Sequence, residues 1–356
     1  MQDSKRCYSL DLIKIIATVL ILFHHFQQVT GIRFRYITFW YGRFYCGRLV
    51  ELFFMISGFL MVPYILRIEE GLTFGRFFFR RYLRLIPIVA LGTACDLVIK
   101  VIDDPSFLTD RPIDRIVEFL SIALGLHGVY TSNETGFSNP MWYISVLLWC
   151  YIIFYVLFAI IRKLPAMKTV YGYFLPCVVI LLGLIVIFGG YNYPFINKHV
   201  GRGCVSFFAG LIVGYFLSRH KIPNKWIPIL LTLLVGSFVL IYPYPMLSYS
   251  LKNILYMVCL CYTLLIMTSQ TSPVIDITKH KVLAPLAKIS FHAYCFHVAV
   301  YDLLVIIMSR SDIGNIAVSN GALTMICTVM IVFVLSCLTY NLIEKPLSKA
   351  LTDKGY

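Results

Sequence analysis

Charged residues are scarce in this chain of 356 residues. They make up 13% of it, whereas hydrophobic residues make up 59%. A typical soluble domain has roughly 25% charged residues, so a chain with a mean hydropathy of +0.81 is predicted to be an integral membrane protein. Acidic residues are fewer than basic ones, with 17 Asp and Glu against 31 Lys and Arg. In a multispan protein, an excess of basic residues mostly reflects the orientation of the spans in the membrane, so we expect no nucleic-acid partner.

The sequence also lacks the marks of a secreted, metal-binding or multidomain protein. The first apolar run is followed by FQQVTGIRFRY, without the small residues of a signal-peptide cleavage site, so we expect it to be retained as a span. The eleven cysteines contain no CxxC pair, which favours small buried side chains over metal ligands or disulfides. No low-complexity linker interrupts residues 1–356. We interpret them as one transmembrane domain without a metal or a permanently bound cofactor.

Apolar runs of about 20 residues can cross a bilayer, and the chain contains ten such runs. They predict an all-α, polytopic transmembrane bundle. The predicted spans are, roughly, Ser9 to Val29, Leu49 to Leu66, Tyr82 to Val101, Met141 to Ile161, Tyr171 to Gly190, Gly203 to Leu217, Trp226 to Tyr242, Leu251 to Ser269, Pro285 to Met308 and Gly321 to Ile343. The sixth is short, and we expect it to be tilted or partly broken. An amphipathic segment, Ile113 to Leu126, is too short to span and is expected at the interface.

Basic residues in the connecting loops set the predicted orientation. With the N-terminus inside, 19 of the 31 Lys and Arg fall on the cytosolic side and 11 on the outer side, while Lys14 lies within the first span. The positive-inside bias therefore favours both termini in the cytosol. The first outer loop is an exception, because it alone holds four arginines. These either are simply solvated or bind an anionic acceptor: Arg33, Arg35, Arg43 and Arg48.

The first span carries ionisable residues within its apolar run. Lys14 and His25 are eleven residues apart, which on a helix is three turns plus about 20° and a rise of about 16 Å. The two side chains therefore share one face at different depths. Ionisable groups inside a membrane are costly and usually functional. We expect His25 to be the functional histidine and the neighbouring His24 to be a packing or lipid-interface residue.

Glu51, at the outer start of the second span, is predicted to lie at the depth of His25. A carboxylate beside an imidazole fixes its tautomer and raises its basicity, as a general base for a hydroxyl acceptor requires. Alternatively, Glu51 caps its helix or pairs with Arg48. At the other side of the membrane, the run RFFFRRYLRLIP contains Arg80, Arg81 and Arg84. Their guanidinium groups match phosphate oxygens, although charge flanking a span often reflects only topology.

Further candidates begin the fourth span and line the ninth. Trp142 lies at the outer interface, where it either stacks on a sugar or serves as an ordinary interface aromatic. Ser290, Tyr294 and His297 share one helical face. His297 is expected to face the bundle interior, either against a substrate or as a structural hydrogen bonder. Glu344, which closes the last span, is expected to pair with Arg84 or Lys14 in a structural role.

These residues occur in an order that resembles the acyltransferase-3 family of multispan membrane acyltransferases, and the resemblance covers nearly the whole chain. Its basic residue, ten intervening positions and histidine correspond to Lys14 and His25. The remaining elements of the family also have counterparts in this chain: FFxxSGF in Phe53, Phe54, Ser57, Gly58 and Phe59; RxxR in Arg81 and Arg84; SxxxYxxH in Ser290, Tyr294 and His297; EKP in Glu344, Lys345 and Pro346. The fourth span, MWYISVLLWCY, lacks the glutamate of many bacterial members, and we expect no hydrolase-like domain after the last span. The chain therefore resembles the stand-alone members.

The resemblance implies O-acylation, with acetyl-CoA or another acyl-CoA as donor and a surface glycan or lipid-linked sugar as acceptor, at a bacterial inner or plasma membrane. On this basis His25 and Glu51 are the expected catalytic pair. Lys14, Arg80, Arg81 and Arg84 are expected to hold the donor phosphates, and Ser57, Trp142, Tyr294 and His297 to contact substrate. The alternative is a transporter or flippase for a lipid-linked sugar or small anion, because intramembrane Lys, His and Glu also form proton pathways. A second copy of the Lys14 to His25 pattern, as related transporter halves would suggest, is not found.

Overall fold

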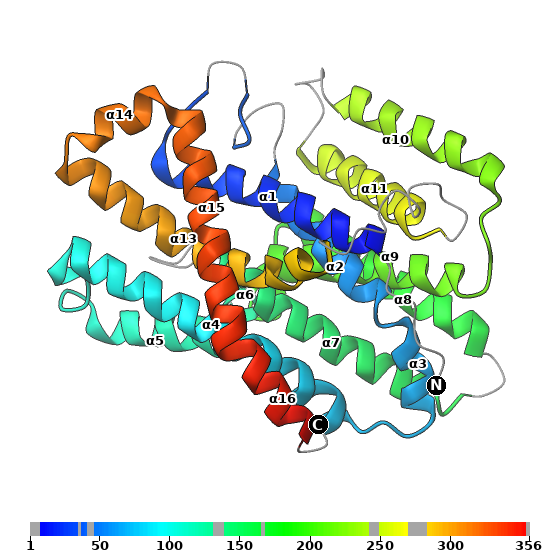
Figure 1. The fold of residues 1–356 in the computed structure, drawn as a ribbon. Helices are drawn as coiled ribbons and strands as arrows, with labels where there is room; N and C mark the ends of the chain where they lie inside the picture. Colours follow the sequence, from blue (N-terminus) through cyan, green and yellow to red (C-terminus); the bar gives the residue numbers. More distant parts are fainter. Residues whose placement is uncertain are drawn as a thin grey trace.

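Long apolar helices dominate the computed structural model, which describes residues 8–34, 37–40, 46–130, 139–164, 168–241, 249–269 and 283–353 (Figure 1). The helices are α1 (Tyr8–Thr30), α2 (Val50–Phe59), α3 (Val62–Glu69), α4 (Phe74–Asp103), α5 (Pro112–Ala123), α6 (His127–Tyr130), α7 (Trp142–Ile161), α8 (Lys168–Gly189), α9 (Lys198–Leu217), α10 (Ile227–Ile241), α11 (Tyr249–Thr268), α13 (Leu283–Arg310), α14 (Ile313–Ser319), α15 (Gly321–Thr339) and α16 (Lys345–Asp353). Two short antiparallel strands, β1 (Asn192–Tyr193) and β2 (Ile196–Asn197), form a hairpin between α8 and α9.

Eight helical segments within the described residues are long and apolar enough to cross a membrane. They are Tyr8–Thr30, Cys46–Glu69, Phe74–Asp103, Trp142–Ile161, Gly172–Gly189, Lys198–Leu217, Leu283–Arg310 and Gly321–Lys349. Shorter apolar helices, Ile227–Gly236 and Ile254–Thr268, lie where the seventh and eighth spans were predicted. The predicted end of the seventh span, Tyr242, is outside the described residues. The membrane-spanning helical bundle is confirmed, whereas the number ten and the cytosolic termini stay predictions.

The boundaries of several spans differ from those predicted. The sixth is a 20-residue helix, α9, rather than a short or broken one, because Asn197 caps its first turn by accepting from the backbone N–H groups of His199 and Val200. Lys198 and Arg202 lower the hydropathy of its first turns, so hydropathy alone predicted a start only at Gly203. The third span begins at Phe74, so the arginine cluster lies within α4. The second span is divided between α2 and α3, which begins again at Val62.

Glycines let α2 and α9 cross in close contact. A Cβ atom on Gly58 would lie 1.9 Å from the Phe207 carbonyl oxygen, and one on Gly210 would lie 1.9 Å from that of Met55. No side chain fits at such a distance, so the two backbones touch through glycine, as small residues allow in membrane bundles. Because Ser57 precedes Gly58, this crossing sets the position of the Ser57 side chain.

Helix α13 packs against α1, α4 and α15 (Figure 1). It runs parallel to α4, because the Lys100 ammonium is 2.8 Å from the Asp302 carboxylate near the later halves of both helices. A Cβ atom on Gly92 would lie 2.6 Å from the Cys295 carbonyl oxygen, so these two helices are also in close contact. The Tyr301 hydroxyl donates to the Leu22 carbonyl and joins α13 to α1.

The segment predicted to be amphipathic forms α5, which is twelve residues long. Its apolar side chains are largely exposed, with Ile113 at 75% of its maximal accessible area. A helix of this length rises only about 18 Å, which is less than the bilayer core. The prediction that this segment is too short to span is confirmed.

We predict that Gly210→Ala destabilises the protein, because the added methyl group must push α9 away from the Met55 carbonyl. Overpacking of this kind costs about 1–3 kcal/mol. The matched control is Gly236→Ala in α10, where nothing lies within 4 Å of the new Cβ atom. Thermal unfolding of the detergent-solubilised variants measures the difference. Equal unfolding temperatures for the two variants would contradict the close crossing.

Candidate functional site

A cavity of about 610 Å³ lies between α1, α2, α4, α7 and α13. We call it the donor cavity, because the residues that were expected to hold the donor phosphates line it. It brings together six of the ten predicted site residues, namely Lys14, Ser57, Arg80, Arg81, Arg84 and Tyr294. These residues come from four helices that are far apart in the sequence. Ser290 and Glu344 also line it.

Basic side chains outnumber acidic ones in the lining of the donor cavity. The basic ones are Lys14, Arg80, Arg81, Arg84 and Lys288, and the acidic ones are Asp11 and Glu344. Walls of low dielectric strengthen the field of such a cluster. The cavity is therefore suited to an anionic ligand. Among the described residues, no three His, Cys, Asp or Glu side chains could hold a metal ion.

Arg81 is stabilised by aromatic rings. Its guanidinium carbon lies 4.2 Å from the centre of the Tyr64 ring and 3.9 Å from that of Phe77, and one nitrogen donates to the Phe77 carbonyl at 2.6 Å. No carboxylate among the described residues pairs with it. Cation–π contacts of this kind stabilise a partly desolvated cation without neutralising it, so Arg81 keeps its full charge toward the cavity.

Arg84 is instead paired with a carboxylate. Its Nε donates to Glu344 Oε1 at 3.1 Å, and the second carboxylate oxygen is 2.7 Å from Nε2 of His292. Nδ1 of His292 is 2.8 Å from the Thr339 hydroxyl. The predicted pairing of Glu344 with Arg84 is confirmed. The buried His292 was not predicted, because its partner lies 52 residues further along the chain.

Aromatic hydroxyls form the inner part of the donor cavity. Ser57 interacts with the phenol groups of Tyr143 and Tyr151. The ring of Tyr294 lies 5.6 Å from that of Tyr143, and its hydroxyl donates to the Pro140 carbonyl. The cavity is thus cationic near the starts of α1 and α4 and aromatic further in.

His25 lies beyond this aromatic part and does not line the donor cavity. It is half-buried, and its Nδ1 is 2.7 Å from the side-chain oxygen of Gln28. Because an amide oxygen only accepts, Nδ1 carries the proton and Nε2 keeps a lone pair. His24 has a different role: its Nδ1 donates to the Phe39 carbonyl, and its ring packs against Gly47. Its packing role was predicted.

His297 stands between the cavity and His25. Its ring centre is 5.7 Å from that of Tyr294, which lines the cavity, and 5.0 Å from that of His25. Nδ1 donates to the Tyr294 carbonyl at 2.7 Å, while the buried Nε2 has no hydrogen-bond partner among the described residues. Tyr294 and His297 therefore connect the donor cavity to His25, and His297 faces the interior as expected.

The expected partnership of Glu51 with His25 is wrong. Glu51 is 1% exposed, and its Oε1 accepts from Arg48 at 3.3 Å and from Arg202 at 2.8 Å. Two full positive charges attract a buried carboxylate more strongly than a neutral imidazole does. Pairing with Arg48, the alternative, is what the structure contains. The carboxylate that was to orient His25 is replaced by the amide of Gln28.

Trp142 belongs to the group around Glu51 rather than to the donor cavity. Its ring stacks on His199 at 4.3 Å, and the Arg202 guanidinium lies over it at 4.7 Å. Of the four arginines in the first outer loop, Arg48 is buried in this group. Arg35 and Arg43 are outside the described residues.

Two further contacts at the site were missed, for different reasons. Gln28 lies three residues after His25, on the same helical face, so spacing alone could have found it. Arg202 contacts Glu51 across 151 residues, and no local pattern carries that information.

One of three comparisons with known proteins identifies a family. Neither a curated protein nor a solved structure matches the chain. The model of one family, described as an acyltransferase domain, matches residues 8–341, nearly the whole chain. Together with the apolar helical bundle, this match identifies a multi-pass membrane acyltransferase, and the chain belongs to the acyltransferase-3 family.

Proposed function

We propose that this protein transfers an acyl group from cytosolic acyl-CoA to a hydroxyl of a surface glycan or lipid-linked sugar. Its place would be a bacterial inner or plasma membrane. The acyl group that we favour is acetyl. The observation that carries this proposal is the donor cavity, in which Lys14, Arg80, Arg81 and Arg84 meet and which leads through Tyr294 and His297 toward His25.

The cationic part of the cavity suits the pyrophosphate of CoA. Arg81 offers a guanidinium that no carboxylate among the described residues neutralises, and the exposed Arg80 and Lys288 add positive charge at the rim. Planar guanidinium groups bind phosphate oxygens in pairs. The narrow pantetheine arm would then extend past Ser57 and Tyr143, which would bring the thioester toward His297 and His25.

His25 is the proposed general base. Nε2 takes the proton of the acceptor hydroxyl while the hydroxyl oxygen attacks the thioester carbonyl carbon. The C–S bond then breaks, and the CoA thiolate takes the proton back from the imidazolium. Gln28 holds the Nδ1 proton and so fixes the tautomer that this step needs.

His25→Ala is expected to lower acetyl transfer by roughly 10² to 10⁴-fold, the usual contribution of a general base. Transfer of radiolabelled acetyl groups from acetyl-CoA to the glycan fraction of producing membranes measures it. Acetyl-CoA binding and the unfolding temperature serve as controls and should stay close to wild type. Transfer at the wild-type rate would exclude His25 as the base.

Gln28→Ala should lower kcat by roughly 5- to 10-fold with little change in KM for acetyl-CoA, because it removes one hydrogen bond from the base. Gln28→Glu, which restores an acceptor at the same position, should recover most of the activity. If both variants lose activity equally, the hydrogen bond to Nδ1 does not orient His25.

Arg81→Lys and Arg81→Ala test the donor site. We expect the dissociation constant for acetyl-CoA to rise about tenfold or more in Arg81→Ala and less in Arg81→Lys, which retains the charge but not the planar fork. Added salt should narrow the difference from wild type. Arg76→Ala is the matched control, because Arg76 is exposed on the same helix and does not line the cavity. Unchanged isotherms for both Arg81 variants would remove Arg81 from the donor site.

A further inference from the structure

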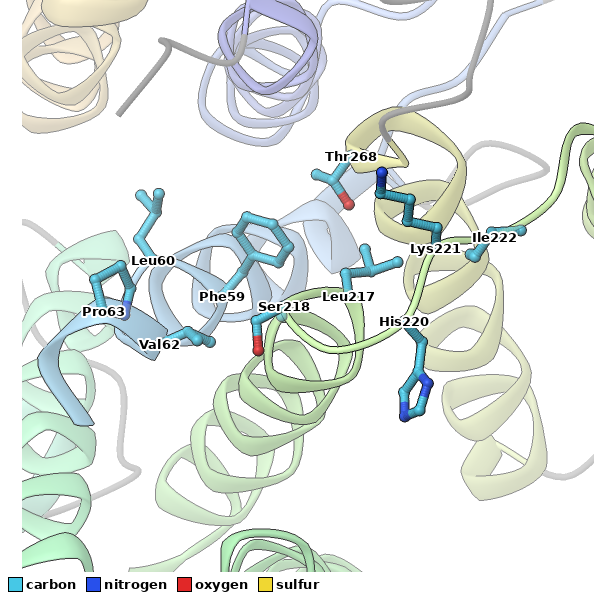
Figure 2. A pocket seen from close by; sticks show the side chains of 11 residues that line it. Phe59, Leu60, Val62, Pro63, Leu217, Ser218, His220, Lys221, Ile222 and Thr268 are labelled. Atoms are coloured by element: carbon cyan, nitrogen blue, oxygen red, sulfur yellow. The ribbon is translucent and has the colours of Figure 1, made fainter. Parts of the chain in front are cut away.

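A second cavity, of about 260 Å³, is shown in Figure 2. It adjoins the donor cavity at Leu60. Its walls come from the junction of α2 and α3, the end of α9, the loop after α9, and the last turn of α11. Figure 2 shows Leu60 and Phe59 at the left of this space, Thr268 and Lys221 at its upper right, and Leu217 below these two. We refer to it as the side cavity.

Leu60 lines both cavities. Around it the wall divides, because Ser57 and Met61 face the donor cavity while Phe59 and Pro63 face the side cavity. Leu60 is 42% exposed and therefore does not seal one space from the other. Because both cavities border this one side chain, they are close enough for an extended ligand to reach into both.

The side cavity combines apolar walls with a cation. Phe59, Leu217 and Ile222 offer flat or aliphatic surfaces, and the exposed Lys221 contributes an ammonium group. An adenine ring has apolar faces that bind such surfaces, and a phosphate binds a lysine. In Figure 2 the Lys221 side chain extends toward Thr268, across the space from Leu60.

We propose that the side cavity binds the adenosine 3′-phosphate end of acyl-CoA, with Lys221 contacting the 3′-phosphate. This inference rests on the proposed function, because it assumes an acyl-CoA donor. Different parts of the donor lie on the two sides of Leu60. The pyrophosphate and the pantetheine arm lie in the donor cavity, among Lys14, Arg80 and Arg81, and the nucleoside lies in the side cavity. The charge and the apolar surface of each cavity match the part of the ligand that it receives.

A lipid chain is the rival occupant of an apolar cavity at this position. Its acyl chain would pack against Phe59 and Leu217, and its headgroup phosphate could reach Lys221, but its binding would not depend on the 3′-phosphate of the donor. The nucleotide uses both, and it also explains why the side cavity adjoins the cationic one. The effect of the 3′-phosphate on binding therefore separates the two occupants.

The first experiment compares acetyl-CoA with acetyl-3′-dephospho-CoA in competition with radiolabelled acetyl-CoA, on the purified full-length protein in detergent. Wild type should bind acetyl-CoA more tightly by on the order of tenfold, as expected for one charge-assisted contact. Lys221→Ala should lose most of this preference by weakening only the binding of acetyl-CoA. Lys225→Ala, an exposed lysine outside both cavities, is the matched control and should keep the preference. An equal preference in wild type and Lys221→Ala would overturn the assignment.

The second experiment fills the side cavity with Leu217→Trp. Binding of acetyl-CoA should weaken about tenfold or more, whereas binding of acetyl-4′-phosphopantetheine, which lacks the adenosine, should not change. Equal weakening of both donors, or of neither, would exclude the nucleoside from this space. If wild type binds none of these donors, the proposed function itself fails; if it binds them without regard to the 3′-phosphate, only the side-cavity assignment fails.

Discussion

The removal of charges from water is the constraint on which this bundle depends. Inside apolar helices, a charged side chain is stable only when it is paired, hydrogen-bonded or held against aromatic rings. Glu51 is paired with two arginines, and Glu344 with Arg84 and His292. Arg81 is held by rings instead. The first two arrangements connect helices that are distant in sequence, while the third leaves a positive charge available to a ligand.

Helices α1, α4 and α13 run in the same direction, and this brings their charged side chains together in one site. Lys14, Arg81 and Lys288 lie in the first turns of their helices, so parallel packing brings them to one cavity. Two to three turns further along, the same packing brings the ring of His25 to 5.0 Å from that of His297. Cationic side chains and imidazole rings thus lie at two depths of one bundle.

The sequence predicted what depends on helical periodicity and hydropathy. It placed Lys14 and His25 on one face, and it grouped Ser290, Tyr294 and His297 on another. Prediction of contacts failed where membrane depth was the only information, because two residues at the same depth can still lie far apart in the plane of the membrane. Glu51 was assigned to His25 at a matching depth, yet its partner Arg202 comes from α9, which no local pattern connects to α2. The length of α9 was missed for a related reason, since hydropathy counts a paired arginine as if it were exposed.

Arg81 and Arg84, two of the three arginines of the donor cavity, are not equivalent, and the turn that carries Glu344 explains why. Residues Tyr340–Glu344 form a π-helical turn, a distortion that often occurs at functional sites. Here one carboxylate oxygen faces Arg84 and the other the buried His292. A phosphate that binds Arg84 must compete with this carboxylate, so its gain is offset by the interaction it displaces. Arg81 has no such competitor among the described residues, and a phosphate there adds its full attraction. Under the proposed function, anion affinity is therefore expected to depend more on Arg81, while Arg84 links the cavity rim to the interior of the bundle.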